Sequence, residues 1–159
     1  MIKFPGRRIV TGHDANGHAM VKIDEIASNV TELRTGLRQT VIWTSDKSPA
    51  NNNGDEDMGA RAVGTAQKGG SVFRIIEYGV GVAPRVHRTD SLDYILILSG
   101  EIYMQIDDTE TLLKAGDVLV QRGNVHNWIN RGPEKCILAA ILLDAEPVTV
   151  NGKPLPSHG

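Results

Sequence analysis

Two stretches with one histidine each constrain the fold of this chain most. The first covers residues 81–100, GVAPRVHRTDSLDYILILSG, and the second covers residues 116–130, GDVLVQRGNVHNWIN. In both, a glycine-bounded turn opens into alternating polar and apolar residues rich in Val, Ile and Leu. Such alternation is typical of short, half-buried strands separated by tight turns. The two stretches therefore predict a β-barrel.

Alternation indicates strands elsewhere in the chain as well. The pair Asn16-Gly17 lies between residues 7–11 and 18–23 and suits a tight turn, which predicts an N-terminal β-hairpin. Further strands are expected at 37–43, 71–78, 101–107 and 135–144. Residues 24–34 are polar and are expected to be irregular. At least eight strands and no convincing helix are the content of an all-β jelly-roll barrel.

The length of 159 residues suits one domain. We expect an N-terminal arm at 1–34, a barrel core at 35–145 and a C-terminal tail at 146–159, which is rich in Pro and Gly. Between two strands, residues 44–70 are dense in Asn, Gly, Asp and Pro and lack apolar periodicity, which predicts a long loop. Loops of this length are usually functional or mobile. This loop either borders the barrel mouth, with Trp43 at its hinge, or is a surface connection.

Charge and composition limit the partners. A net charge of −2 gives no basic footprint of the kind that nucleic-acid binders show. The longest apolar run, ILAAILL, is too short to span a membrane, and the start MIKFPGRR lacks the apolar core of a signal peptide. The single cysteine, Cys136, lies beside that run and is expected to be a core side chain rather than a nucleophile. We therefore expect a cytoplasmic protein with a small-molecule substrate, and neither nucleic acid nor membrane as a partner.

The two histidine stretches resemble the paired motifs of the cupin superfamily, small β-barrels that often hold a metal between the motifs. In the first motif, Gly81, His87, Asp93 and Gly100 follow the family's spacing. However, Thr89 stands where the family has a second His, and Asp93 stands where it has Glu. The resemblance implies a single-domain cupin jelly roll and a homodimer, because small cupins commonly pair through N-terminal strands and one sheet face.

The second motif also keeps most of the family's residues. Gly116, Gly123, His126 and Asn130 are in place, while Gln121 stands at the family's Pro position and lies one residue closer to Gly116 than the family has it. Since successive strand residues point to opposite faces, each motif presents its histidine on one face. The resemblance implies that these faces point into the barrel.

The resemblance also implies a metal site made of His87, Asp93 and His126. Two histidines and a carboxylate match the set that binds Fe(II), and similar sets hold Zn, Mn or Ni. No organic cofactor is implied. Against a metal, Asp is shorter than Glu by one methylene, and the hydroxyl of Thr89 is a poor ligand. The same three residues would otherwise form an acid–base cluster. A third possibility is a set of satisfied core polar groups without chemistry.

Further side chains are candidates for binding a substrate. Arg74 has the strand parity of Val72 and would bind a carboxylate or phenolate if it points inward. Trp128 follows His126 on the same face and would stack on a planar substrate. Trp43 and Thr89 complete the expected contacts.

From these residues we expect a small-molecule enzyme that acts on an oxygenated organic substrate inside the barrel. Its reaction would be of the dioxygenase, isomerase, decarboxylase or dehydratase/cyclase type. The alternative is a non-catalytic cupin that binds or senses a small ligand. Turnover separates these two functions, because a binder takes up its ligand without converting it.

Overall fold

The computed structural model describes residues 3–156 and 158, and the regular elements of this part of the chain are β-strands apart from one short 3₁₀ turn. The elements are β1 (Arg7–His13), β2 (Ala19–Ile26), β3 (Val30–Arg34), β4 (Leu37–Ser45), η1 (Met58–Ala60), β5 (Ser71–Tyr78), β6 (Ser91–Ser99), β7 (Glu101–Ile106), β8 (Thr109–Lys114), β9 (Val118–Arg122), β10 (Asn127–Ile129), β11 (Cys136–Asp144), β12 (Thr149–Val150) and β13 (Lys153–Pro154). The all-β prediction is confirmed. No helix in the described residues has the length and apolar character needed to cross a membrane. The ends of the expected arm and tail, residues 1–2, 157 and 159, lie outside the described residues.

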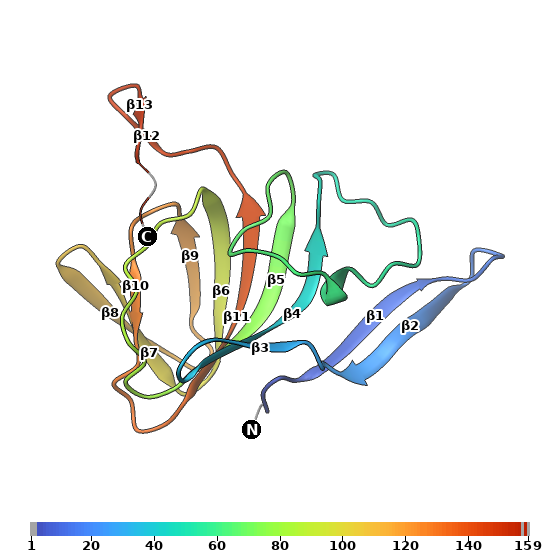
Figure 1. The fold of residues 1–159 in the computed structure, drawn as a ribbon, viewed down its shortest axis with the longest axis horizontal. Helices are drawn as coiled ribbons and strands as arrows, with labels where there is room; N and C mark the ends of the chain where they lie inside the picture. The colour runs from blue at the N-terminus through green and yellow to red at the C-terminus, as the bar shows by residue number, and fades with distance from the viewer. Residues whose placement is uncertain (1–2, 157, 159) are drawn as a thin grey trace.

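Two antiparallel sheets form the barrel (Figure 1). The larger sheet has the order β3-β4-β5-β11-β6-β9, and the smaller has the order β10-β7-β8. Their inner faces share one hydrophobic core, which contains Ile97 and Leu138 from the larger sheet and Ile102 and Trp128 from the smaller. Cys136 is fully buried in this core, and burial raises the pKa of its thiol to about 12, which suits a packing role.

Strand alternation decides which side chains enter the barrel. In β6, Asp93, Ile95 and Ile97 are buried, whereas Tyr94 and Leu96 between them are exposed. The central strand β11 pairs with β5 on one side and β6 on the other. The expected inward face of the first motif is therefore observed. The outward face of β6 exposes apolar side chains, and the expected homodimer stays a prediction.

The N-terminal hairpin of β1 and β2 pairs with no other strand in the described part of the chain and extends away from the barrel (Figure 1). Its turn carries Gly17 at φ +81°, as the Asn-Gly pair predicts. The expectation of an irregular segment at 24–34 is wrong. β2 continues to Ile26, and β3 pairs with the edge of β4. β3 is mostly exposed and therefore lacks the apolar alternation by which a half-buried strand is recognised.

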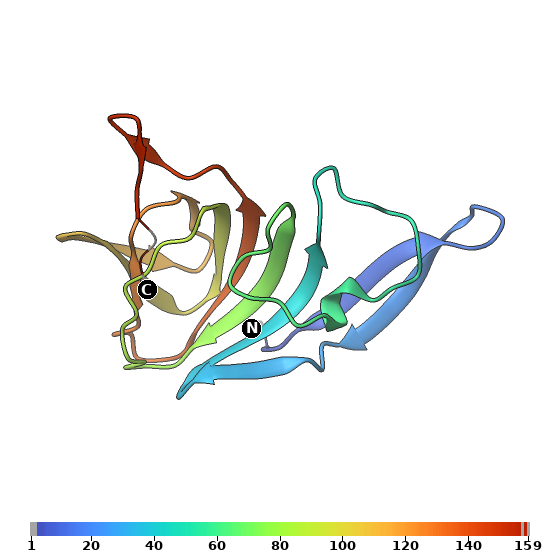
Figure 2. The same ribbon diagram turned by 45° about the horizontal axis from the view of Figure 1, so that its top comes forward.

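The long loop lies beside β4 and β5, between the barrel and the hairpin, in both Figure 1 and Figure 2. It is shorter than expected at its start, because β4 continues to Ser45. It also contains the short turn η1, which Asp57 caps by accepting a hydrogen bond from the backbone N–H of Gly59 at 2.9 Å. A side-chain cap thus builds a local element in a segment without apolar periodicity.

Candidate functional site

A cavity of about 470 Å³ lies inside the barrel. Six of the seven side chains expected at the site line it, namely His87, Thr89, Asp93, His126, Trp128 and Arg74. The seventh, Trp43, is absent from the lining and pairs with Phe73 along β4 and β5. A cavity of this size with a few polar groups among apolar ones suits a small organic molecule.

His87 and His126 come from different motifs and face each other. Their backbones exchange two hydrogen bonds, at 3.0 and 2.9 Å, and their ring centroids lie 4.3 Å apart. Each ring places Nδ1 3.0 Å from a backbone carbonyl two residues earlier, Arg85 for His87 and Asn124 for His126. A neutral imidazole that donates from Nδ1 has a free lone pair on Nε2. Both histidines are therefore held as acceptors at Nε2.

Burial keeps both imidazoles neutral. Desolvation is the largest cause of the shift in each ring, and it lowers the pKa of His126 to about 4. The pKa of His87 is also lowered, against the raising effect of its hydrogen bond to the Arg85 carbonyl. At neutral pH both rings can take up a proton from a bound molecule.

Asp93 and Gln121 form the second part of the site. β6 and β9 pair these two residues directly, and both are nearly inaccessible to solvent. Gln121 donates from Nε2 to Asp93 Oδ2 at 3.2 Å. The same nitrogen lies 3.0 Å from Nδ1 and 3.1 Å from Nε2 of His126. Because Nδ1 donates to the Asn124 carbonyl, Nε2 is the atom that accepts from Gln121. The amide of Gln121 therefore joins the carboxylate to the imidazole.

Two buried oxygens of this pair remain without a partner. Among the described residues, Asp93 Oδ1 and Gln121 Oε1 accept no hydrogen bond. Burial raises the pKa of the Asp93 carboxyl, and the hydrogen bond from Gln121 opposes that rise. An unsatisfied buried acceptor costs about 1–3 kcal/mol.

The residues in this arrangement do not fit a three-ligand metal centre. Within the described residues, no group of three or more His, Cys, Asp or Glu side chains is placed to hold an ion. The amide of Gln121 lies between Asp93 and His126, and Thr89 shares a hydrogen bond of 2.8 Å with Ser91 Oγ. His87 and His126 supply two unprotonated nitrogens without a third ligand, and the one of His126 already accepts from Gln121. The metal set of His87, Asp93 and His126 stays a prediction.

Arg74 connects the cavity to the long loop. It is only 4% exposed and points inward from β5, as its strand parity suggested. Its guanidinium donates to Gln39 Oε1 at 2.7 Å and to the carbonyls of Gly64 and Thr65 at 2.7 and 2.8 Å. Residues 63–65 thus form part of the cavity wall. Of the two hypotheses for the loop, the structure agrees with the one that places it at the barrel cavity.

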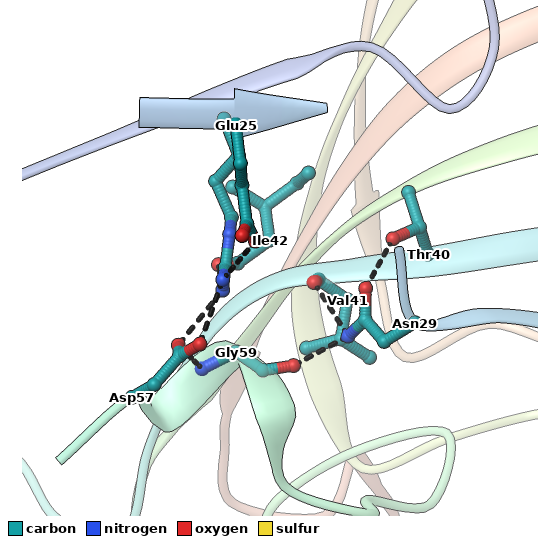
Figure 3. Close-up of polar contacts among 8 residues, drawn as sticks. Glu25, Asn29, Thr40, Val41, Ile42, Asp57 and Gly59 are labelled. Carbon is teal, nitrogen blue, oxygen red and sulfur yellow. Dashed lines mark hydrogen bonds and ion pairs between the residues drawn. The ribbon is translucent and has the colours of Figure 1, made fainter. Parts of the chain in front are cut away.

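A second contact fixes the loop on the side of the N-terminal hairpin (Figure 3). Arg8 of β1 is buried and donates to both carboxylate oxygens of Asp57, at 2.8 and 2.7 Å, and to Glu25 at 2.6 Å. Near this contact, Asn29 donates to the carbonyl of Val41 in β4 and to the carbonyl of Gly59 in η1. The loop is therefore attached both to the hairpin and to the barrel.

Sequence reasoning missed several lining residues, namely Gln121, Gln39, Tyr78, Arg34 and Arg85. The signal for Gln121 was its place at the family's Pro position. Arg85 precedes His87 by two residues and so could have been assigned to the same face. Gln39 and Arg34 enter the cavity through strand pairing, which no motif predicts.

Comparison with known proteins agrees with this architecture. The Cupin domain family model matches residues 72–142. The chain is 34% identical to the cupin-domain-containing oxidoreductase fogC of Aspergillus ruber, over 95% of this chain and 78% of that protein. It is 32% identical to the phomopsin biosynthesis cluster protein C′ of Diaporthe leptostromiformis, over 93% and 83% of the two chains. The chain therefore belongs to the cupin-domain family.

The fold is similar to that of solved cupins. The cupin domain of Schizosaccharomyces pombe Cnp3 superposes with a TM-score of 0.54 at 14% identity, covering 87% of each chain. At this identity the likeness concerns the fold alone. It confirms the jelly-roll barrel that the two motifs predicted.

Proposed function

We propose that this chain is a small-molecule enzyme that moves protons on an oxygenated organic substrate inside its barrel. The observation that carries the proposal is the pair of neutral imidazoles, His87 and His126, 4.3 Å apart at their ring centroids and both held with Nε2 unprotonated. They face a cavity that also contains the unpartnered oxygen of Asp93. Relatives named as cupin-domain-containing oxidoreductases support an enzyme rather than a binding module.

The residues divide into a base and an acid. His87 is the less buried of the two rings, and its Nε2 accepts a proton from a carbon next to a carbonyl or from a hydroxyl. The electron pair left on the substrate moves to the carbonyl oxygen and forms an enolate. The carboxyl of Asp93, whose pKa burial raises, returns a proton to that enolate. Proton return at a different atom completes an isomerisation.

The same groups also serve a dehydration or a cyclisation. In a dehydration, the acid protonates a departing hydroxyl while the base removes the proton from the neighbouring carbon, so that water leaves and a double bond forms. The apolar part of the cavity, which includes Ile95, Leu142 and Trp128, excludes bulk water from these steps.

Deuterium exchange tests the proposal directly. Protein treated with chelator and dialysed is incubated in D₂O with a panel of 1,3-diketones and α-hydroxyketones, and exchange at carbon is followed by proton NMR. We expect the wild type to accelerate exchange on at least one panel member, and His87→Gln to lose most of that acceleration. His13→Gln, on the exposed turn of the hairpin, is the control and should match the wild type.

Two outcomes would contradict proton transfer. Exchange or turnover that appears only after Fe, Mn, Ni or Zn is added would point to metal chemistry. Binding of panel members without exchange or conversion would favour the non-catalytic ligand-binding alternative.

A further inference from the structure

Positive side chains outnumber negative ones in the lining of the cavity. Four charged residues line it, the three arginines Arg34, Arg74 and Arg85 and the single carboxylate Asp93. The two lining histidines are neutral at pH 7 because burial lowers the pKa of each. With Asp93 ionised, the lining therefore carries two more positive charges than negative charges.

The three guanidinium groups also lack ion-pair partners in the described part of the chain. Six of the seven arginines outside the cavity contact a carboxylate within 4.0 Å, namely Arg7, Arg8, Arg38, Arg61, Arg88 and Arg131. Arg34, Arg74, Arg85 and the exposed Arg122 outside the cavity make no such contact among the described residues. The buried Arg8 and Arg88 are both neutralised by an ion pair, so the buried Arg74 is an exception, while Arg34 is half-buried and Arg85 is exposed.

Arg74 is the most buried of the three. Its three hydrogen-bond acceptors, Gln39 and the carbonyls of Gly64 and Thr65, are all neutral. Its Nε has no partner among the described residues, and neither has the buried Nε of Arg34. Burial lowers the pKa of Arg74, and the charge of Asp93 opposes this effect only in part, since the two side chains form no ion pair within 4.0 Å. A buried guanidinium without a direct ion pair is costly, because it loses its hydration. A bound anion would remove that cost.

The charges of the three arginines affect the same groups in the cavity. The buried phenol of Tyr78 has its pKa raised chiefly by desolvation, and Arg34, Arg85 and Arg74 each oppose that rise through their charge. Arg34 and Arg85 also lower the pKa of His87 by their charge. Their fields therefore overlap beside the proposed base. Low-dielectric walls strengthen such a field and attract ligands of the opposite sign.

We propose that the cavity selects a substrate bearing a carboxylate, and that Arg34, Arg74 and Arg85 form the site for this group. A carboxylate matches the planar fork of arginine and accepts two hydrogen bonds from it. The remainder of the substrate would lie along Ile76, Ile95 and Trp128, beside the two histidines. This inference rests on the proposed function for its description of the bound molecule as a substrate, whereas the anion site itself rests on the arginines.

Matched pairs of probes test the charge preference without knowledge of the substrate. Binding of benzoate and benzamide, and of hexanoate and hexanamide, is measured by isothermal titration calorimetry and by the fluorescence of the cavity residue Trp128. Each pair has nearly the same shape and differs in charge. We expect the carboxylate of at least one pair to bind about tenfold more tightly than its amide, since hydrogen bonds to charged groups are stronger. Added salt should weaken that preference.

Arginine variants test which side chains cause the preference for a carboxylate over an amide. The double change Arg34→Gln and Arg85→Gln should abolish the advantage of the carboxylate and leave the affinity for the amide unchanged. Arg122→Gln, an exposed arginine of β9 outside the cavity, should behave as the wild type. Equal binding of acid and amide in both pairs would overturn the proposal, as would a carboxylate preference that survives the double change. Carboxylate binding without deuterium exchange would contradict the proposed function alone.

Discussion

Gln121 places its side-chain amide nitrogen 3.2 Å from a carboxylate oxygen of Asp93. The contact exists because β6 and β9 pair these two residues directly in an antiparallel register. The same nitrogen lies 3.1 Å from Nε2 of His126, so one amide can serve two acceptors. Asp93 and His126 are thereby linked through a neutral side chain.

Replacing Gln121 by Leu should separate the two groups. The hydrogen bond from Gln121 lowers the pKa of Asp93, so its loss should move this pKa further above the usual value. We expect the proton exchange of the proposed function to fall while the barrel stays folded. The side-chain carbon of Asp93, followed by NMR over a pH titration, gives the measurement. Gln67→Leu, in the loop and outside the cavity, is the control, and an unchanged Asp93 pKa in Gln121→Leu would contradict the link.

Acid should destabilise the wild type through His126. Its pKa falls from 6.5 in the unfolded chain to about 4 in the fold, so the unfolded chain binds more protons between these values. Stability is therefore lost as the pH falls from about 6.5 to about 4, by on the order of 3 kcal/mol for this group alone. Asp93 acts in the opposite direction, because its pKa is raised. Urea unfolding at pH 7 and pH 4 measures the net change.

The change His126→Asn separates the contribution of His126 to the pH dependence of stability from that of Asp93. Without the imidazole, the variant should lose less stability than the wild type between pH 7 and pH 4. His13→Asn, at the exposed end of β1, is the matched control and should keep the wild-type pH dependence. A variant at position 126 with the same pH dependence as the wild type would show that the ring is not held neutral by burial.

Thr89→His should strengthen the binding of a divalent metal in the cavity. Thr89 lines the cavity with His87 and His126, and both histidines present an unprotonated Nε2, which in His126 lies 3.1 Å from the amide of Gln121. A third imidazole completes the ligand number that Zn²⁺ takes in open sites. We expect affinity for Zn²⁺ to rise about tenfold or more over the wild type, measured by competition with a chelating dye. The control is Thr109→His at the exposed start of β8, and equal affinities in all three proteins would contradict the geometry.

Asp57→Ala should weaken the attachment of the long loop to the N-terminal hairpin. Arg8 would keep Glu25 but lose two hydrogen bonds, and η1 would lose its cap. Because the carboxylate of Asp57 is about one-third exposed, we expect a cost of only about 1 kcal/mol in the free energy of unfolding. Hydrogen exchange should quicken in residues 56–61. Residues 63–65 should change less, since Arg74 holds them separately, and a uniform loss of protection would show that the two attachments act as one.

The residues that share a strand face could be predicted from the sequence because strand alternation is a local property. The period of two placed Asp93 with Ile95, and His126 with Trp128, and the resemblance to cupins implied that these faces point inward. For Arg74 the same rule left an inward and a surface position open, and the structure buries it. The edge strand β3 escaped prediction because its residues are mostly exposed and so carry no alternation.

The motif spacing determined which residues enter the cavity, and the register between strands decided what those residues do there. The pairing of β6 with β9 put Gln121 beside Asp93, although these residues are far apart in the sequence. The pairing of β3 with β4 and the fold of the long loop gave the cavity Arg34 and the carbonyls that hold Arg74. Hydrogen bonding and charge act over a few ångströms in space. Such distances between residues remote in sequence are settled only when the sheets close into a barrel.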